Sequence, residues 1–208
     1  KYFGEPNNYN IIVKPINPKS KKVIFENKTL TVKSIPLNHR IPSCGFLFEE
    51  KPKELNIKKD MIHRYNLLVS DIVKIKQGND HITESGEVIE NSKLTMPALC
   101  PRSYAYISDT KYREVLAPQV NGIDLLYHEA TFLHKDLERA TETYHTTAKQ
   151  AGMLAQKAKV KKLLIGHFST RYKNESLFLQ EAKNEFENCV AVNDGDRFDI
   201  PLVRENKG

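Results

Sequence analysis

The sequence predicts an α/β protein of 208 residues. From Tyr104 onward, short apolar runs alternate with longer segments of helical character, a pattern typical of helices layered on a sheet. Three of the apolar runs end abruptly in a histidine or a carboxylate. Polar groups gathered at one edge of such a sheet are where α/β folds usually place their chemistry. The pattern therefore favours an enzyme, or part of one, over a plain binding module.

The composition is that of a globular domain with one core. Hydrophobic residues make up 39% of the chain and charged residues 28%. No apolar run approaches the roughly 20 residues that span a bilayer, and we expect no signal peptide ahead of the domain. The three cysteines are odd in number and lack Cys-x-x-Cys spacing. We therefore expect reduced, mostly buried thiols in a cytoplasmic protein, without a disulfide frame or a thiolate zinc site.

The net charge of +6 is unevenly distributed. Residues 1–76 contain 15 Lys and Arg against 7 Asp and Glu, whereas residues 77–208 contain 17 against 19. A basic half suggests a polyanionic partner, most commonly a nucleic acid. A solvated, lysine-rich surface with no partner is the other interpretation of the same charge.

In the first half we expect strands at 11–16, 30–35 and 45–49, because these runs are short and rich in β-branched or aromatic residues. Residues 51–102 are more polar and contain turn-like Gly, Asn and Ser clusters. One short helix is expected there, around 54–65. We interpret residues 51–102, called the arm below, as an insertion on the domain and not as a second core.

The second half is expected to alternate strands and helices. The predicted strands are 104–108, 123–128 and 162–167, and the predicted helices lie near 112–120, 146–159 and 174–188. Thr147 and Gln150 have the spacing of a capping box at the start of the middle helix. Small residues on one face of that helix suit close packing on a sheet: Ala148, Ala151, Gly152 and Ala155.

Seven histidines are present, and three of them stand in polar contexts typical of a surface: His63, His81 and His134. The remaining four are His39, His128, His145 and His167. A lone loop histidine such as His39 is usually structural, and a histidine at a strand end, such as His167, can be a hydrogen-bonded rim residue. Asp109, directly after another strand, could be the N-cap of the next helix.

Taken together, these side chains favour chemistry over structure. Imidazole nitrogens and carboxylate oxygens are suitable zinc ligands, and a carboxylate can bridge two ions. A two-metal site suits phosphodiester hydrolysis, because it can activate a water and stabilise both the attacking and the leaving oxygens.

His145 stands just before a predicted helix and could shuttle protons as a neutral imidazole. The helix N-terminus disfavours its cationic form, whereas a neighbouring carboxylate would favour it. Glu129 is a candidate for that carboxylate, and the two residues would then form a general acid pair. A helix-cap histidine packed on the sheet is the alternative.

Five phrases occur in an order that closely resembles ribonuclease Z, the tRNA 3′-processing endoribonuclease of the metallo-β-lactamase superfamily. They are Asn-His-Arg-Ile-Pro-Ser-Cys-Gly-Phe at 38–46, Ser-Asp-Thr at 108–110, His-Glu-Ala-Thr-Phe at 128–132, Tyr-His-Thr-Thr-Ala at 144–148 and Gly-His-Phe-Ser-Thr-Arg-Tyr at 166–172. Each phrase alone is weak, but five in order are specific. The resemblance covers essentially the whole chain.

The resemblance implies a metallo-β-lactamase-like αββα sandwich with two zinc ions in a complete active site. His39, Asp109 and His167 match zinc ligands of the family, with Asp109 as the bridging carboxylate. Glu129 and His145 match the residues that assist proton transfer to the leaving 3′ oxygen. Zinc and manganese both accept such ligands.

The arm occupies the place of the family's exosite, a protrusion that grips the tRNA elbow. Residues 75–78 resemble the exosite's Leu-Lys-x-Gly phrase, but the Gly-Pro-rich lead-in is absent, and residues 66–71 stand in its place. The resemblance implies that Lys74 and Lys76 contact tRNA phosphates without regard to sequence. Exposed lysines with no role are the alternative.

The family's His-x-His-x-Asp-His motif does not occur in these 208 residues. We therefore expect the chain to be the C-terminal part of one metallo-β-lactamase-like domain, lacking most of the first half. With three of seven expected ligands, it should bind metal weakly or not at all and should not cleave alone. A separate first half could complete the site in trans.

The resemblance implies that the whole protein is a cytoplasmic homodimer that removes the 3′ trailer from precursor tRNA. Two alternatives stay open. One is another metallo-β-lactamase-type phosphodiesterase acting on a small substrate, against which the basic half and the arm argue. The other is a non-catalytic fragment that binds tRNA or mediates dimerisation.

Overall fold

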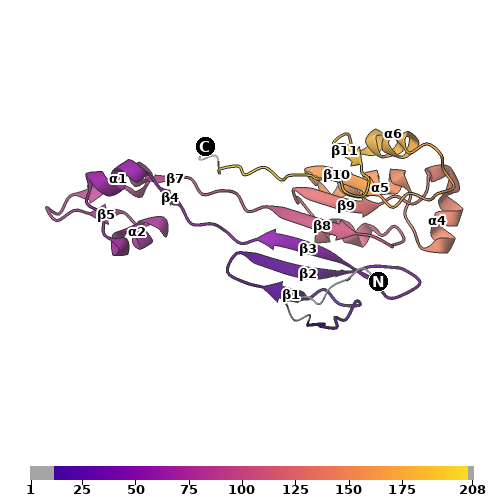
Figure 1. The fold of residues 1–208 in the computed structure, drawn as a ribbon, viewed down its shortest axis with the longest axis horizontal. Helices are drawn as coiled ribbons and strands as arrows, with labels where there is room; N and C mark the ends of the chain where they lie inside the picture. The colour runs from indigo at the N-terminus through magenta and orange to yellow at the C-terminus, as the bar shows by residue number, and fades with distance from the viewer. Residues whose placement is uncertain (1–11, 206–208) are drawn as a thin grey trace, which may run out of the picture.

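The computed structural model describes residues 12–205, and its largest element is a mixed seven-stranded sheet (Figure 1). In spatial order the strands are β1 (Val23–Glu26), β2 (Leu30–Pro36), β3 (Cys44–Glu50), β8 (Ser103–Ile107), β9 (Leu125–Glu129), β10 (Lys162–Gly166) and β11 (Cys189–Ala191). The first four strands pair antiparallel, and β8 to β11 pair parallel. The carboxyl ends of β8, β9 and β10 therefore meet at one edge of the sheet.

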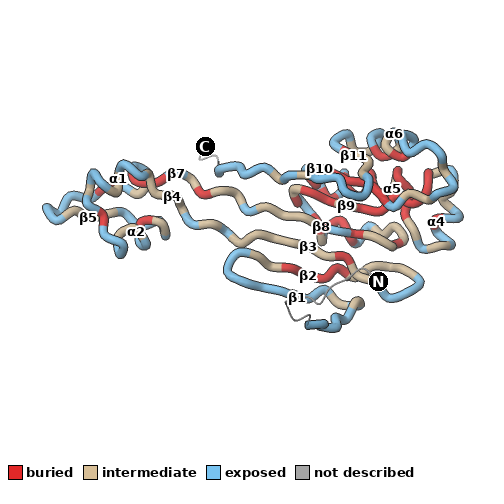
Figure 2. The backbone as a smooth tube through the Cα atoms, in the orientation of Figure 1, coloured by how far each residue is buried: buried red, intermediate tan, exposed pale blue. Residues whose placement is uncertain are grey.

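Helices pack on one face of the sheet and enclose the core. They include η1 (Glu114–Gln119), η2 (His134–Asp136), α4 (Leu137–Thr143), α5 (Ala148–Ala158) and α6 (Ser176–Glu185). Alternate residues of the strands point into this core, among them Ile107, Leu126 and Ile165, each fully buried. Figure 2 shows the buried residues concentrated where α5 lies on β9 and β10.

α5 begins as the sequence predicts. The Thr147 hydroxyl accepts a hydrogen bond from the Gln150 backbone, and the Gln150 side chain accepts one from the Thr147 backbone, which is a complete capping box. The small-residue face is buried, as expected. Gly152 on that face lies against α6, where the Ala182 carbonyl leaves no room for a Cβ.

The opposite face of the sheet carries aromatic side chains. Tyr104, Tyr106 and Tyr127 line a cavity of about 530 Å³ together with the segment 192–200. The rings of Tyr106 and Tyr127 stack with centroids 4.9 Å apart, and burial raises the pKa of Tyr127 to about 12. His167, which follows β10, also lines this cavity.

The arm lies apart from the sheet, at the end of two long connections that leave β3 and return to β8 (Figure 1). Its elements are β4 (Asn56–Ile57), α1 (Lys59–Arg64), α2 (Val69–Lys76), β5 (His81–Ile82), β6 (Val88–Ile89), α3 (Asn91–Leu94) and β7 (Thr95–Met96). Leu67, Ile75, Ile89 and Leu94 form a buried cluster of their own. The prediction of a single helix and no separate core is therefore wrong in both respects.

Other elements also differ from prediction. No strand forms over residues 12–16, while Ile11 lies outside the described residues. Pro15 lacks the N–H that a ladder needs, and the edge strand is β1 instead. Residues 114–119 form a 3₁₀ helix that contains Pro118. α4 and β11 were not expected at all.

Within residues 12–205, no helix has the length and apolar character to cross a membrane.

Candidate metal and catalytic site

Polar side chains converge at the edge where three parallel strands end. Asp109 follows β8, Glu129 is the last residue of β9, and His167 follows β10 directly. Because these strands are neighbours in register, their carboxyl ends bring the three side chains together. The Nε2 atom of His167 is 3.5 Å from Oδ1 of Asp109.

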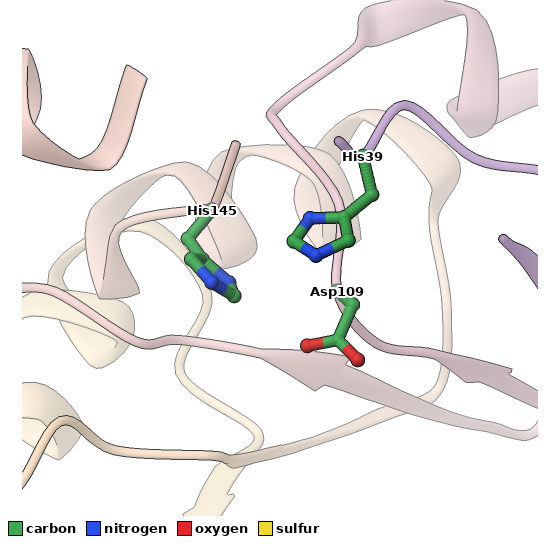
Figure 3. A group of neighbouring side chains, drawn as sticks. All are labelled: His39, Asp109 and His145. Atoms are coloured by element: carbon green, nitrogen blue, oxygen red, sulfur yellow. The ribbon is translucent and has the colours of Figure 1, made fainter. Parts of the chain in front are cut away.

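Two further histidines reach this edge from loops. His39 lies in the loop between β2 and β3, and its Nδ1 atom is 3.2 Å from the Tyr144 carbonyl oxygen. His145 lies in the loop that follows α4. The side chains of His39, Asp109 and His145 lie next to one another (Figure 3). One potential ligand atom from each lies within 4.8 Å of the other two. Two imidazole nitrogens and a carboxylate oxygen at such distances fit the donor set of a zinc ion.

Glu129, His145 and His167 make a second group, in which one potential ligand atom of each residue also lies within 4.8 Å of the other two. His145 belongs to both groups, so its ring lies between those of His39 and His167, with centroid distances of 5.2 and 5.4 Å. The structure thus brings all five predicted residues into one cluster. It does not place His39, Asp109 and His167 in a group by themselves.

Glu129 is fully buried and accepts several hydrogen bonds. Its Oε1 accepts from the Thr110 backbone N–H at 2.7 Å, and Oε2 accepts from the Thr146 backbone N–H at 3.2 Å. Nδ1 of His145 is 2.9 Å from Oε1. Burial would raise the pKa of Glu129, but the hydrogen bonds from His145, Thr131 and Thr110 outweigh it and lower that pKa.

The same hydrogen bond changes the pKa of His145 in the opposite direction from that of Glu129. The hydrogen bond to Glu129 raises the pKa of His145, and partial burial of the ring opposes this only in part. Glu129 therefore favours the protonated form of the His145 imidazole, which is the form that a general acid needs.

Three residues of the site have a left-handed backbone. Asp109, Tyr144 and His167 have φ values of 55°, 63° and 63°. Such conformations are costly for residues other than glycine and concentrate at functional sites. They turn the chain sharply after β8, α4 and β10, so that each side chain or carbonyl faces the cluster. The N-cap interpretation of Asp109 is wrong, because the following helix begins only at Glu114.

His128, the fourth histidine of interest, points into the core instead. It is fully buried, and its Nδ1 is 2.7 Å from the Glu129 carbonyl oxygen. Burial lowers its pKa, so the ring is neutral. It belongs to neither group of potential ligands.

Sequence reasoning did not single out the threonines that support Glu129. Thr110, Thr131 and Thr146 are all buried, and each donates to Glu129 through a backbone or hydroxyl group. Their positions in the sequence could have indicated this role, because each threonine stands one or two residues after a candidate site residue. Thr110 follows Asp109, Thr131 follows Glu129, and Thr146 follows His145.

The two lysines of interest lie on α2 of the arm. Lys74 is exposed, whereas Lys76 makes an ion pair with Glu54 at 2.8 Å. Figure 1 shows α2 far from the strand ends that carry the cluster. A contact between these lysines and a substrate bound at the cluster therefore requires a long ligand.

Curated relatives share much of this sequence. Ribonuclease Z of Phocaeicola vulgatus is 44% identical over 98% of this chain and 66% of its own length. Ribonuclease Z of Bacteroides fragilis is 48% identical over 88% of this chain and 60% of its own length. The chain thus spans between three fifths and two thirds of these relatives. No family model matches it.

Solved structures show the same fold. The metallo-β-lactamase fold protein YhfI of Bacillus subtilis gives a TM-score of 0.52 at 16% identity, covering 86% of this chain and 51% of that one. The short form of human tRNase Z gives 0.51 at 20% identity, covering 88% and 48%. These two solved structures show that the chain has the metallo-β-lactamase fold. The curated relatives, at 44% and 48% identity over most of the chain, show that it belongs to the ribonuclease Z family.

Proposed function

We propose that the whole protein is a zinc-dependent endoribonuclease that removes the 3′ trailer from tRNA precursors. The observation that carries this proposal is the convergence of His39, Asp109, Glu129, His145 and His167 at one edge of the sheet. The curated relatives are named ribonuclease Z, which supports the reaction class.

His39, Asp109 and His167 are the proposed zinc ligands of this chain. Their nitrogens and carboxylate oxygens match the ligand preference of zinc, and Asp109 has two oxygens with which to bridge two ions. When bound, zinc would supply a Lewis acid and lower the pKa of the attacking water. Manganese is compatible with the same donors.

Glu129 and His145 are the proposed proton-transfer pair. Glu129 favours the protonated form of His145, and the ring is only partly buried, so the imidazole would be accessible to a substrate oxygen. His145 would give its proton to the 3′ oxygen of the discriminator nucleotide as the phosphodiester bond breaks. The tRNA would leave with a 3′-hydroxyl group.

The arm is the proposed tRNA-binding exosite. It lies apart from the cluster (Figure 1) and carries Lys74 and Lys76, so a tRNA bound at the cluster would have to extend to the arm. Lys76 would first have to release Glu54, so we expect Lys74 to contribute more to binding.

We propose that the cluster needs residues that this sequence does not contain. It has no His-x-His-x-Asp-His motif, and it spans only 60 to 66% of the relatives named above. Alone, the chain should therefore bind zinc weakly and leave precursor tRNA uncut. A cytoplasmic homodimer is the proposed state of the whole protein, and three free thiols suit a reducing compartment.

The test is a trimming assay on a 3′-extended tRNA with the protein at the full length of its relatives. We expect cleavage after the discriminator nucleotide, loss of cleavage on chelation, and loss in Asp109→Ala. The exposed Glu187→Ala variant is the control, since that side chain lies outside both ligand groups and does not line the cavity that contains His167. Cleavage of small phosphodiesters but not of tRNA would instead support another phosphodiesterase. Binding of tRNA without cleavage would support a non-catalytic module.

A further inference from the structure

The Thr131 hydroxyl has contacts in the cluster besides its hydrogen bond to Glu129. Thr131 follows the end of β9 by two residues and is 7% exposed. Its hydroxyl oxygen is 2.5 Å from Oε2 of Glu129 and 2.8 Å from Nδ1 of His167. It is also 3.3 Å from Nδ1 of His145. No other hydroxyl in the described part of the chain has hydrogen-bond contacts with both Glu129 and His167.

We propose that Thr131 is a positioning residue whose hydroxyl links the buried Glu129 carboxylate to His167 and fixes the proton of that ring on Nδ1. The proposal rests on the proposed function only in one respect, namely that Nε2 of His167 would face a zinc ion. The arrangement is that of a metal-binding histidine held by a hydrogen bond to its other nitrogen.

In the hydrogen bond between Thr131 and Glu129, the hydroxyl of Thr131 is the donor. Backbone N–H groups can only donate, and those of Thr110 and Thr146 donate to the two different oxygens of Glu129. Both oxygens therefore act as acceptors, as in a carboxylate. A threonine hydroxyl has a single proton, so Thr131 donates that proton to Glu129.

The hydrogen bond to Thr131 also determines which ring nitrogen of His167 carries the proton. With its proton committed, the Thr131 oxygen can only accept, so Nδ1 of His167 must be the donor at 2.8 Å. In the neutral ring Nε2 then carries a lone pair. That atom is 3.5 Å from Oδ1 of Asp109, and a lone pair opposite a carboxylate is an arrangement that a cation would stabilise.

The hydroxyl group of Thr131, and not its methyl group, positions the ring of His167. The Thr131 carbonyl accepts from the Ser169 backbone at 3.1 Å, which ties the loops after β9 and β10 together independently of the side chain. Valine has the same shape as threonine and keeps this backbone contact but cannot hydrogen-bond. Serine keeps the hydroxyl and loses only the methyl group.

The experiment measures the tautomer of His167 by ¹⁵N-detected NMR on the full chain, under mildly alkaline conditions where imidazoles are neutral. We expect the Nδ1–H form in the wild type and in Thr131→Ser, and a shift to the Nε2–H form in Thr131→Val. Thr95→Val, which removes a hydroxyl of similar burial in the arm, should leave His167 unchanged. An Nε2–H form in the wild type, or an unchanged tautomer in Thr131→Val, would overturn the proposal.

A second measurement uses the full-length protein and zinc alone. We expect Thr131→Val to weaken zinc affinity about 10- to 100-fold, and Thr131→Ser to restore most of it. Equal affinities in wild type and Thr131→Val would count against the proposal. The tautomer readout needs no catalysis, so failure to trim tRNA would sink the proposed function and leave this result intact. If Thr131→Val does not fold, the tautomer of His167 in the wild type and in Thr131→Ser still tests the proposal, because both are expected to show the Nδ1–H form.

Discussion

At the scale of single residues, the carboxylate of Glu129 connects the fold to the chemistry. Two of its donors are backbone N–H groups from the loops after β8 and before α5. The same carboxylate contacts His145 and Thr131. A charge in such a buried place is tolerated because every one of these partners is a donor. The group that sets the protonation of His145 therefore also holds three loops together.

Glu129→Gln should destabilise the protein by about 2–4 kcal/mol, because the amide would present a donor to groups that donate. Urea unfolding of the variant and the wild type measures the difference. The control is Glu84→Gln, which changes an exposed carboxylate of the arm and should stay within about 0.5 kcal/mol. A loss no greater than that of the control would contradict the account of Glu129.

The sequence predicted which residues gather at the site but not how they are connected. His39, Asp109 and His167 stood out because each ends or follows an apolar strand. The contacts of Thr131 depend on two loops that approach only after β9 and β10 have paired. Long-range hydrogen bonds of this kind leave no local pattern in the sequence, so only the structure revealed them.

At the scale of elements, the packing of α5 on α6 depends on one glycine. A Cβ at Gly152 would be 2.6 Å from the Ala182 carbonyl oxygen and 2.9 Å from Cβ of Glu185. The backbone oxygen cannot move away without displacing α6. Small residues on α5 thus serve contact with a neighbouring helix as well as with the sheet.

Gly152→Ala should therefore destabilise the protein by about 1–3 kcal/mol, although alanine is ordinarily the better helix former by 0.5–1 kcal/mol. The midpoint of thermal unfolding measures the effect. Gln156→Ala, at an exposed position of the same helix, is the matched control and should change little. A more stable Gly152→Ala variant would show that propensity outweighs the clash.

The base of the arm is closed by Glu50 and Arg102. The guanidinium donates to Glu50 Oε1 at 2.6 Å, and the Arg102 backbone N–H donates to Oε2 at 3.0 Å. The hydrogen bond from Arg102 is the main cause that lowers the pKa of Glu50 from 4.5 to about 2. A lowered folded-state pKa contributes stability above the ordinary value, and that stability is lost as the pH falls from about 4.5 to about 2.

Glu50→Gln should cost about 1 kcal/mol at neutral pH, since Arg102 is 38% exposed and solvent screens the pair. The cost should shrink as the pH is lowered through this window, because wild-type Glu50 is then protonated as well. Chemical unfolding of both proteins at several pH values checks this. A cost that is independent of pH would mean that the charge of Glu50 contributes nothing.

Elements were predictable where local patterns are strong. β8, β9, β10, α5 and α6 all form within a few residues of their predicted bounds, because apolar runs and a capping box mark them. The arm was not predictable in detail, since its helices are short and its four-residue cluster is assembled from segments far apart in the sequence. β11 has only three residues and forms by pairing with β10.

At the scale of the whole molecule, the proposed tRNA interface joins two separated regions, the arm and the cluster (Figure 1). In the proposed exosite, each lysine that neutralises a phosphate should make the fall of log affinity with log salt steeper by about 0.9 on duplex nucleic acid. Lys74→Ala should weaken tRNA binding and make that slope shallower by about one. Lys183→Ala, an exposed lysine on α6, is the control and should leave the slope unchanged. Equal slopes for wild type and Lys74→Ala would remove Lys74 from the proposed interface.

The completeness of the metal site is also a property of the whole molecule. Within residues 12–205, two groups of potential ligands share His145, and Glu129 already occupies one nitrogen of that ring. Two zinc ions have more coordination positions than His39, Asp109 and His167 provide. The chain alone should therefore bind zinc weakly, well below two ions per chain.

Metal analysis of the purified chain, beside its Asp109→Ala variant, checks this expectation. Near zero zinc in both proteins would mean that the cluster is a partial site, and activity then belongs to a longer protein. Close to two ions per chain, lost in Asp109→Ala, would contradict the expectation, because residues 12–205 provide too few ligands for two ions. Sedimentation of the chain with and without zinc would then test whether a second copy supplies the remaining ligands through metal-dependent association.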